Sequence, residues 1–340
     1  MPTIKELSAL TGVSKSTVSR VINNDPNVSD KTRQLVLDAI RQINYTPNII
    51  ARSMITGRLP LVLIIVGDIL SYHFAKAVAG IEKVLSGTDY MPVIYTSMYD
   101  EEKERKLLDM AKQFKFAGVI PMTSIGSRQL SLTLDEMEDI PIVLINKYIK
   151  RSRFDAVIAD EYESAYAVTS ELIKNGHKRI AYLTFVNNQN MKTRISQERE
   201  LGYREAMIDN GLEIDEKIIF PGKLDMASGY ELAPRIFQDP AITGICSNNY
   251  LMAAGINRYA KQIGKRPLVD YDIGCCETIS DFYATDVIFA GPDLQLIGEK
   301  AAELLLSRMQ GSTAAPQKIT FSVDRIYNPK TENKIQNIGE

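Results

Sequence analysis

Apolar residues recur at helical spacing through the first 45 residues and predict three short helices. In the first helix, Ile4, Leu7 and Leu10 form one apolar face. Gly12 tolerates the positive φ of a helix end, and Ser14 can cap the helix that follows it. The apolar residues expected to point inward from the second and third helices, the latter starting near Ser29, are Val18, Val21, Ile22, Leu35, Val36, Ala39, Ile40 and Ile43.

From residue 61 the pattern changes to strand-like apolar runs that alternate with helical stretches. Residues 61–66 form a continuous β-branched and aliphatic run, as in a strand buried on both faces. A helix through Phe74, Val78, Ile81 and Leu85 follows it. Further strand-like runs lie at 92–96, 117–121, 141–145, 155–159, 179–184, 217–220, 243–246, 271–275 and 287–290. Further helical stretches lie at 101–114, 128–138, 162–175, 197–210, 227–237, 249–262 and 293–309.

Strands and helices that alternate at this length predict parallel sheets with right-handed crossovers. The strand-like runs are too many for one open sheet of ordinary size, so we expect two doubly wound α/β subdomains with a cleft between them. Open α/β sheets bind ligands at the carboxyl ends of their strands. The candidate ligand-binding loops therefore lie near 67–74, 97–100, 122–126, 146–148, 185–199, 247–250 and 275–281.

Charge is distributed unevenly along the 340 residues, although the net charge is only −2. Residues 1–60 hold eight Lys or Arg and four Asp or Glu, a net of +4. The remaining 280 residues hold 32 basic and 38 acidic side chains, a net of −6. A basic head on an acidic body is expected when one end of a protein meets the phosphates of nucleic acid.

Three cysteines, Cys246, Cys275 and Cys276, are too few for a disulfide framework and indicate a reduced, cytoplasmic protein. No apolar run approaches the ~20 residues that cross a bilayer, and the N-terminus does not resemble a signal peptide. The two histidines, His73 and His177, form no metal-ligand spacing with the cysteines. Neither a metal, a cofactor nor a membrane is therefore expected as a partner.

The second predicted helix leaves a polar and basic side exposed. A helical face of this kind suits the major groove of DNA, where base edges offer donors, acceptors and thymine methyl groups. The alternative is a small helical bundle whose polar side only meets solvent. The residues expected on the exposed side are Lys15, Ser16, Thr17, Ser19, Arg20 and Asn23.

Six motifs in this order resemble the lactose/galactose repressor (LacI/GalR) family over nearly the full chain. The head motifs are TIKELS at 3–8 and GVSKSTVSRVIN at 12–23, and the hinge motif is NYTPNIIARSM at 44–54. The body motifs are GHKRIA at 176–181, RELGYREAM at 199–207 and LIGEKAAELL at 296–305. The family implies a homodimeric, ligand-responsive transcription regulator, usually a repressor. Its body has the periplasmic-binding-protein fold.

The resemblance also divides the chain. It implies a helix-turn-helix DNA-binding domain at 1–46, a hinge at 47–60 and a ligand-binding and dimerisation domain at 61–340. Within that domain, one subdomain would comprise about 61–160 plus 291–320, and the other about 161–290 plus 321–330. The polar tail after Tyr327 lacks heptads, which favours a dimer over a tetramer.

The family assigns roles to the head residues. Lys15 and Ser16 fall where members differ in operator choice, and Arg20 falls at a position that reaches bases. The hydroxyl and amide side chains would mainly hold phosphate and sugar, with helix capping as the alternative role for each hydroxyl. These backbone contacts would come from Thr3, Ser14, Thr17, Ser19 and Asn23, and at the third helix from Ser29, Lys31 and Thr32.

The hinge at 48–55 is short and poor in helix formers, so it is a costly helix to nucleate alone. The family implies that it folds on operator DNA beside its twin from the other subunit. Met54 would then wedge into the minor groove, and the small Ala51 would allow the two hinges to pack closely. The alternative is a disordered linker that contacts no bases.

The family places effector contacts on the loops given above. His73 and Phe74 fall on the first loop, Asn146 and Asn249 on later ones, and Arg199 matches an arginine that usually points into the cleft. A surface salt bridge beside Glu198 and Glu200 is the alternative role for Arg199. A sugar or sugar derivative is the expected effector.

One departure from the family falls at Cys276, where an aspartate usually accepts hydrogen bonds from the ligand. Either the ligand is not a simple sugar, or Glu277 or Asp281 has taken this role. Cys276 itself is either a redox sensor or a plain buried cysteine.

An enzyme, or a small-molecule-binding protein without a regulatory role, is the alternative function for this fold. The sequence has no Gly-x-Gly-x-x-Gly, P-loop or nucleophile-elbow motif, and its carboxylates show no evident pairing. The residues therefore favour a regulator that binds double-stranded operator DNA and a small molecule.

Overall fold

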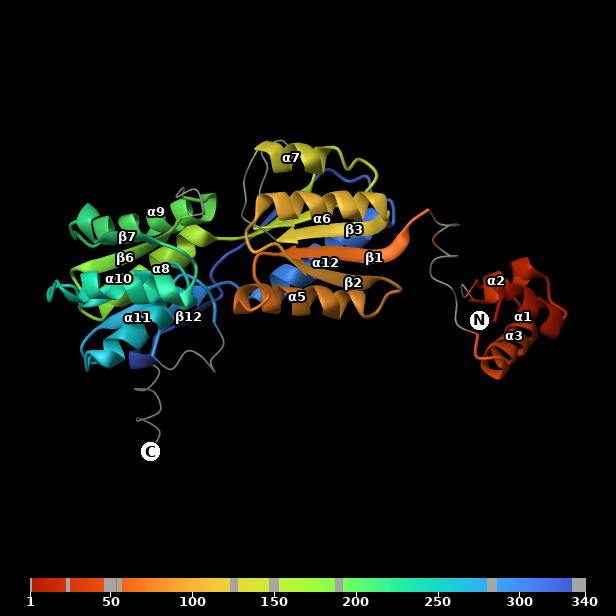
Figure 1. The fold of residues 1–340 in the computed structure, drawn as a ribbon, viewed down its shortest axis with the longest axis horizontal. Coiled ribbons are helices and arrows are strands. Elements are labelled where there is room, and N and C mark those ends of the chain that lie inside the picture. Colours follow the sequence, from red (N-terminus) through yellow and green to blue (C-terminus); the bar gives the residue numbers. More distant parts are fainter. Residues whose placement is uncertain are drawn as a thin grey trace, which may run out of the picture. The chain divides into compact units, whose positions relative to one another are not determined.

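The computed structural model describes residues 2–22, 25–45, 53, 57–122, 128–146, 153–186, 192–279 and 286–331, with only the backbone of 128–131. The chain forms two compact units, Met1–Pro60 and Leu61–Glu340, which we call the head and the body. Figure 1 shows the elements of both. Among the described residues, no helix combines the length and the hydrophobicity that a membrane crossing requires.

The head contains α1 (Ile4–Thr11), α2 (Lys15–Ile22) and α3 (Asp30–Gln42) (Figure 1). Between α1 and α2, Gly12 adopts a left-handed conformation with φ of 69°, as predicted for the end of a helix. The buried side chains that join the three helices are Leu7, Val18, Val21, Val28, Val36, Ala39 and Tyr45.

The prediction of the head's core is wrong at two residues, because Leu10 and Leu35 are 49% and 48% exposed. The buried side of α3 runs through positions 36, 39, 40 and 43, the spacing of one helical face, and Leu35 lies just outside it. Val28 and Tyr45, from the segments around α3, complete the core instead.

The first lobe of the body has a sheet in two three-stranded parts. One part has the order β2 (Met91–Thr96), β1 (Leu59–Val66), β3 (Phe116–Met122), and the other has the order β11 (Lys318–Phe321), β5 (Asp155–Ala159), β4 (Val143–Ile145). A parallel bridge between Val119 and Ile142 connects the two parts. The pairs β1–β2, β4–β5 and β5–β11 are parallel, as the alternation of elements predicts.

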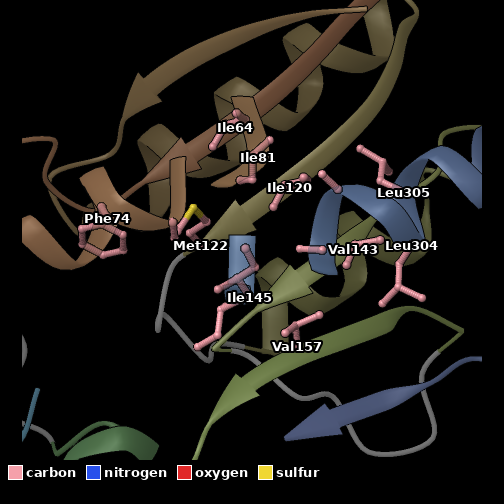
Figure 2. Close-up of a cluster of buried hydrophobic side chains, with 14 of the residues drawn as sticks. Ile64, Phe74, Ile81, Ile120, Met122, Val143, Ile145, Val157, Leu304 and Leu305 are labelled. Atoms are coloured by element: carbon pink, nitrogen blue, oxygen red, sulfur yellow. The ribbon is translucent and has the colours of Figure 1, made fainter. Parts of the chain in front are cut away.

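Helices cover both faces of this sheet. Helices α5 (Tyr72–Leu85) and α12 (Leu294–Met309) pack on one face, and α6 (Glu101–Gln113) packs on the other, where α7 (Arg128–Asp135) also lies (Figure 1). Strand β1 is buried on both sides: Ile64 joins the cluster under α5 and α12, and Ile65 joins the cluster under α6. Figure 2 shows the first cluster, in which Ile64 and Ile81 lie near Ile120.

The second lobe has one six-stranded sheet. Its order is β12 (Arg325–Tyr327), β10 (Ile288–Gly291), β9 (Asp272–Cys275), β8 (Gly244–Ser247), β6 (Ile180–Phe185), β7 (Ile219–Gly222). The helices are α8 (Glu161–Lys174) and α9 (Arg194–Asp209) on one face, and α10 (Met226–Phe237) and α11 (Tyr250–Gln262) on the other. Two doubly wound subdomains are thus confirmed.

The sequence reading of the strands is wrong at two places. The strand predicted at 217–220 begins only at Ile219, because residues 216–218 form a 3-10 turn that Asp215 caps through the Lys217 N–H. Strands β11 and β12 were not predicted, and β12 pairs antiparallel with β10, against the parallel expectation. Both are short and partly exposed, so neither carries a continuous apolar run.

Glycines allow three pairs of helices to approach at backbone distance. A Cβ on Gly298 of α12 would lie 1.9 Å from the Ala77 carbonyl oxygen of α5, and one on Gly80 would lie 2.0 Å from the Gln295 oxygen. Gly202 stands similarly close to Tyr162, in the α8–α9 pair. The α10–α11 pair has the same arrangement, and these contacts fix how the helices pack in both lobes.

Candidate functional sites: the helix-turn-helix surface and the interlobe cleft

The hydroxyl side chains of the head cap its helices. Thr3 accepts the Glu6 N–H at 3.3 Å, and Glu6 in turn accepts the Thr3 N–H at 2.9 Å, which completes a capping box. Ser14 accepts the Thr17 N–H at 3.2 Å, as predicted for a cap of α2. Ser29 caps α3 in the same way, through the Thr32 N–H at 3.3 Å.

The outward side of α2 is polar and basic. Lys15, Ser16 and Arg20 are exposed, and Thr17 and Ser19 are half-buried. The carboxylate near Arg20 is that of Asp25, at 3.9 Å, which is too far for a tight ion pair. The Arg20 guanidinium is therefore available at the surface. Lys31 is exposed and Thr32 half-buried at the start of α3. Asn23, Ala51 and Met54 lie outside the described residues.

A cavity of about 70 Å³ lies between the two lobes of the body. Its walls come from the segments that follow the carboxyl ends of strands in both lobes, which is where an open α/β sheet binds ligands. This cavity is small beside typical ligand pockets, which have volumes of ~300–1,000 Å³. The lining residues are Ser71, His73, Phe74, Tyr99, Met122, Asn146, Glu161, Phe185, Thr193, Ile195, Arg199, Leu224, Asn248, Asn249 and Glu277.

Arg199 is buried at the centre of this cleft. Its Nε and Nη2 donate to Glu161 Oε2 at 2.7 and 2.6 Å. Its Nη1 donates to Asn248 Oδ1 at 3.0 Å and also to the Asn248 carbonyl oxygen. The surface salt bridge considered for Arg199 is therefore wrong, because its partners are buried residues from α8 and from the loop after β8.

Two carboxylates face Arg199 from different walls. Burial raises the pKa of Glu161 and of Glu277 above their ordinary values, although the nearby Arg199 cation opposes the rise in both. Glu277 Oε1 accepts the Tyr250 N–H at 2.7 Å, at the start of α11. This geometry brings Glu277 to the cavity, where the sequence pattern proposed it as a substitute for the missing aspartate.

His73 and Asn146 form a hydrogen-bonded pair with a defined direction. Asn146 Oδ1 accepts the Ala159 N–H at 2.9 Å, so its Nδ2 is the donor to His73 Nε2, also at 2.9 Å. His73 is then neutral, with its proton on Nδ1. Burial, together with the nearby Arg199 cation, lowers the pKa of His73 to about 4.

A strained turn places Tyr99 in the cleft. Met98 and Tyr99 both have positive φ, 54° and 57°, which is uncommon for side chains larger than asparagine. The ring also needs Gly67, because a Cβ there would lie 2.4 Å from the Tyr99 ring. Tyr99 lies between Phe74 and Phe185, with ring centroids 6.4 Å from each, so an aromatic row crosses from one lobe to the other.

The cleft brings together six of the predicted effector residues: His73, Phe74, Asn146, Arg199, Asn249 and Glu277. Cys276 is not among the lining residues. It is fully buried, with its Sγ 3.6 Å from Cys246 Sγ, and burial raises its thiol pKa. Asp281 lies outside the described residues.

The sequence reading missed Glu161, Tyr99, Phe185 and Asn248 as lining residues, although three of them lie on predicted loops. Glu161 lies directly after the strand at 155–159, a loop that was not counted among the candidate walls. The rule that selected the other loops would have found it. Among the described residues, no group of three His, Cys, Asp or Glu side chains could hold a metal ion.

Comparison with known proteins gives consistent matches for both units. Residues 3–48 match the bacterial regulatory proteins of the lacI family, and residues 60–323 match the periplasmic binding proteins and sugar binding domain of the LacI family. The HTH-type transcriptional regulator DegA of Bacillus subtilis (strain 168) is 28% identical over 333 residues, which cover 97% of this chain and 98% of DegA.

Two solved structures illustrate the similarity in fold. The transcriptional regulator CelR–cellobiose complex is 25% identical, with a TM-score of 0.69, and the match covers 96% of this chain and 99% of that one. The lac repressor dimer bound to operator and the anti-inducer ONPF is 19% identical, with a TM-score of 0.79 and coverages of 96% and 99%. The latter likeness shows a shared fold.

Proposed function

Because this chain belongs to the LacI family of bacterial regulatory proteins, we propose that it is an operator-specific repressor controlled by a carbohydrate-like ligand in the interlobe cleft. Like its named relatives, the chain is a DNA-binding transcription regulator. It is not an enzyme. The observation that carries the proposal is the combination, on one chain, of the exposed basic side of α2 and a cleft between two lobes that is lined by aromatic and polar side chains.

In the head, we assign base contacts to Lys15, Ser16 and Arg20, which are exposed on one helix. Contacts to phosphate and sugar are assigned to side chains around the helix starts, where N–H groups and hydroxyls can also hold phosphate. These are Thr3, Ser14, Thr17, Ser19, Asn23, Ser29, Lys31 and Thr32. The hinge roles of Ala51 and Met54 rest on the family resemblance.

In the body, the cleft supports a carbohydrate-like ligand by its mixture of side chains. Sugars present both apolar C–H faces and many hydroxyl groups, so they suit aromatic rings beside convergent polar groups. Here the rings of Phe74, Tyr99 and Phe185 lie beside Arg199 and Asn146. The regulator CelR, which shares this fold, was solved as a complex with cellobiose.

We further propose a homodimer in which each body meets its twin through an apolar surface that includes β2. This edge strand of the first lobe exposes Met91, Ile94 and Tyr95, at 54%, 42% and 41%. Exposed apolar residues on an edge strand favour association with another chain. The lac repressor, a relative in fold, is a dimer on its operator.

The chain would then consist of a DNA-binding domain at 1–46, a hinge at 47–60 and the ligand-binding body at 61–340. Two heads would lie in successive major grooves of a pseudo-palindrome. Ligand binding would change the angle between the lobes of each body and thereby the operator affinity. The compartment that this function requires is the cytoplasm, where the chromosome lies.

Retardation of promoter DNA tests the proposal. The DNA upstream of the regulator's own gene and its neighbours is the natural probe. We expect the full chain, but not residues 61–340, to retard a subset of these fragments in the presence of excess nonspecific DNA. If the full chain retarded none of the fragments even at low salt, where phosphate contacts are strongest, the proposal would be contradicted.

A further inference from the structure

One buried oxygen in the cleft has no hydrogen-bond partner among the residues that the structure describes. Glu161 is only 3% exposed, and its Oε2 accepts both hydrogen bonds from Arg199. Its Oε1 is buried and accepts no hydrogen bond from any described residue. A buried carboxylate oxygen without a donor is costly, because burial removes water and nothing replaces it. Glu161 lines the cavity, so a ligand in the cavity is positioned to supply that donor.

The cation beside this carboxylate is already occupied. Arg199 makes four contacts, two with Glu161 and two with Asn248, and a guanidinium has five N–H groups. Arg199 therefore has little capacity left for an anionic group on a ligand. Its contacts hold Glu161 in place instead.

Acidic side chains outnumber basic ones among the described residues that line the cavity. Glu161 and Glu277 stand against one cation, Arg199, and no other Lys or Arg is among the described lining residues. His73 adds no positive charge, because its Nε2 accepts from Asn146. The Asp68 carboxylate contributes further negative charge near Tyr99.

We propose, on the basis of the function proposed above, that the cleft selects uncharged or amino-bearing carbohydrates and rejects phosphorylated and carboxylated ones. Glu161 Oε1 accepts a hydroxyl or ammonium donor from the ligand, and Glu277, in the loop after β9, accepts a second. A phosphate or carboxylate at this place would meet two carboxylates in a space with little water, where like charges repel strongly.

A panel of matched carbohydrates tests this selection on the full chain by isothermal titration calorimetry. For the gluco, galacto and manno scaffolds it contains the neutral sugar, the 2-amino sugar, the 6-phosphate and the uronate, and it adds cellobiose. We expect at least one neutral or amino member to bind and its anionic counterparts to bind at least tenfold more weakly. An anionic member that binds as tightly as its neutral parent, or a panel in which nothing binds, would overturn the selection.

Substitutions locate the acceptors. Glu161→Gln keeps the size of the side chain but can turn an NH2 donor toward the ligand, so affinity for the best binder should fall about tenfold to hundredfold. Glu277→Gln should also lower affinity. The Glu277 carboxylate accepts from the Tyr250 N–H and is not hydrogen-bonded to Arg199, so this variant tests the proposal even if Glu161→Gln fails to fold. Glu102→Gln is the matched control, since Glu102 is an exposed partner of Arg105 on α6.

Unchanged affinity in both cleft variants would contradict the assignment of Glu161 and Glu277 as acceptors. Retardation of promoter DNA by the same preparations separates the two levels of inference. A chain that binds its operator but prefers anionic sugars keeps the proposed function and loses this inference. A chain that binds neutral sugars and no DNA loses the proposed function.

Discussion

Tyr99 of the first lobe and Phe185 of the second face each other across the cleft, with ring centroids 6.4 Å apart and planes inclined at 52°. The two rings approach from the ends of β2 and β6, which belong to different sheets. Both rings line the cavity between the lobes. A ligand that enters the cleft therefore contacts or displaces rings from both lobes.

Phe185→Ala should weaken carbohydrate binding about tenfold, because the ligand loses an aromatic surface from the second lobe. Calorimetric titration of the tightest-binding carbohydrate measures the effect. Phe114→Ala, which removes an exposed ring after α6, is the control and should leave the affinity unchanged. Equal affinities of the Phe185 variant and the unmodified chain would show that Phe185 does not contact the ligand.

His73 should titrate with a pKa of about 4, far below the ordinary value near 6.5. A second proton would place an N–H on Nε2 opposite the Asn146 amide donor, and burial disfavours the cation. The chain has two histidines, so the His73 resonance in proton NMR can be assigned by its loss in His73→Gln. A midpoint near 6.5 would contradict the neutral, part-buried pair with Asn146.

The same pKa shift has a consequence for stability. Between pH 6.5 and 4, His73 binds a proton in the unfolded chain but not in the folded one, so the free energy of unfolding should fall as pH falls through this window. In urea titrations at a series of pH values, His73→Gln should show a shallower fall. Parallel pH profiles of the two proteins would exclude a contribution from His73.

Lys15→Ala should change operator choice, since Lys15 is exposed on the outward side of α2. Discrimination at one base pair should weaken by about 1–3 kcal/mol, as for loss of a direct base contact. Lys31→Ala, a proposed phosphate contact, should instead weaken binding to all sequences and reduce the salt slope by roughly one. Selection from a randomised operator pool measures both, and an equal loss on every sequence would make Lys15 a phosphate contact.

Gly298→Ala should destabilise the body by about 1–3 kcal/mol, because its Cβ would overlap the Ala77 carbonyl oxygen and force α5 and α12 apart. Gly87→Ala is the control, since nothing lies within 4 Å of a Cβ at Gly87. Urea unfolding compares the two variants. A Gly298 variant as stable as the unmodified chain would mean that these helices separate without cost.

The sequence pattern predicted the elements that bury one face of a helix or both faces of a strand along their whole length. The run at 61–66 showed a strand covered on both faces, and the structure divides its side chains between two cores. The pattern failed where burial depends on tertiary neighbours. Leu10 and Leu35 have the right chemistry but lie at the edge of the faces that pack, and β11 and β12 are ordered mainly by the strands they join.

In the cleft, the sequence identified positions better than it identified partners. Arg199 could be placed from the family motif, but its ion pair with Glu161 joins residues 38 positions apart and depends on the packing of α8 against α9. The direction of the His73–Asn146 hydrogen bond depends likewise on the Ala159 N–H. Cys276 follows a strand as the cavity residues do, yet its side chain turns into the core of the second lobe.

Linkage between the ligand and the operator tests the central claim most directly. The affinity of the full chain for its tightest-binding carbohydrate is measured by calorimetry with and without saturating operator DNA. A ligand-controlled regulator must show the same coupling in both directions, so the two affinities should differ by roughly 5–150-fold. Identical affinities, with operator binding intact, would contradict the claim that the cleft controls the head.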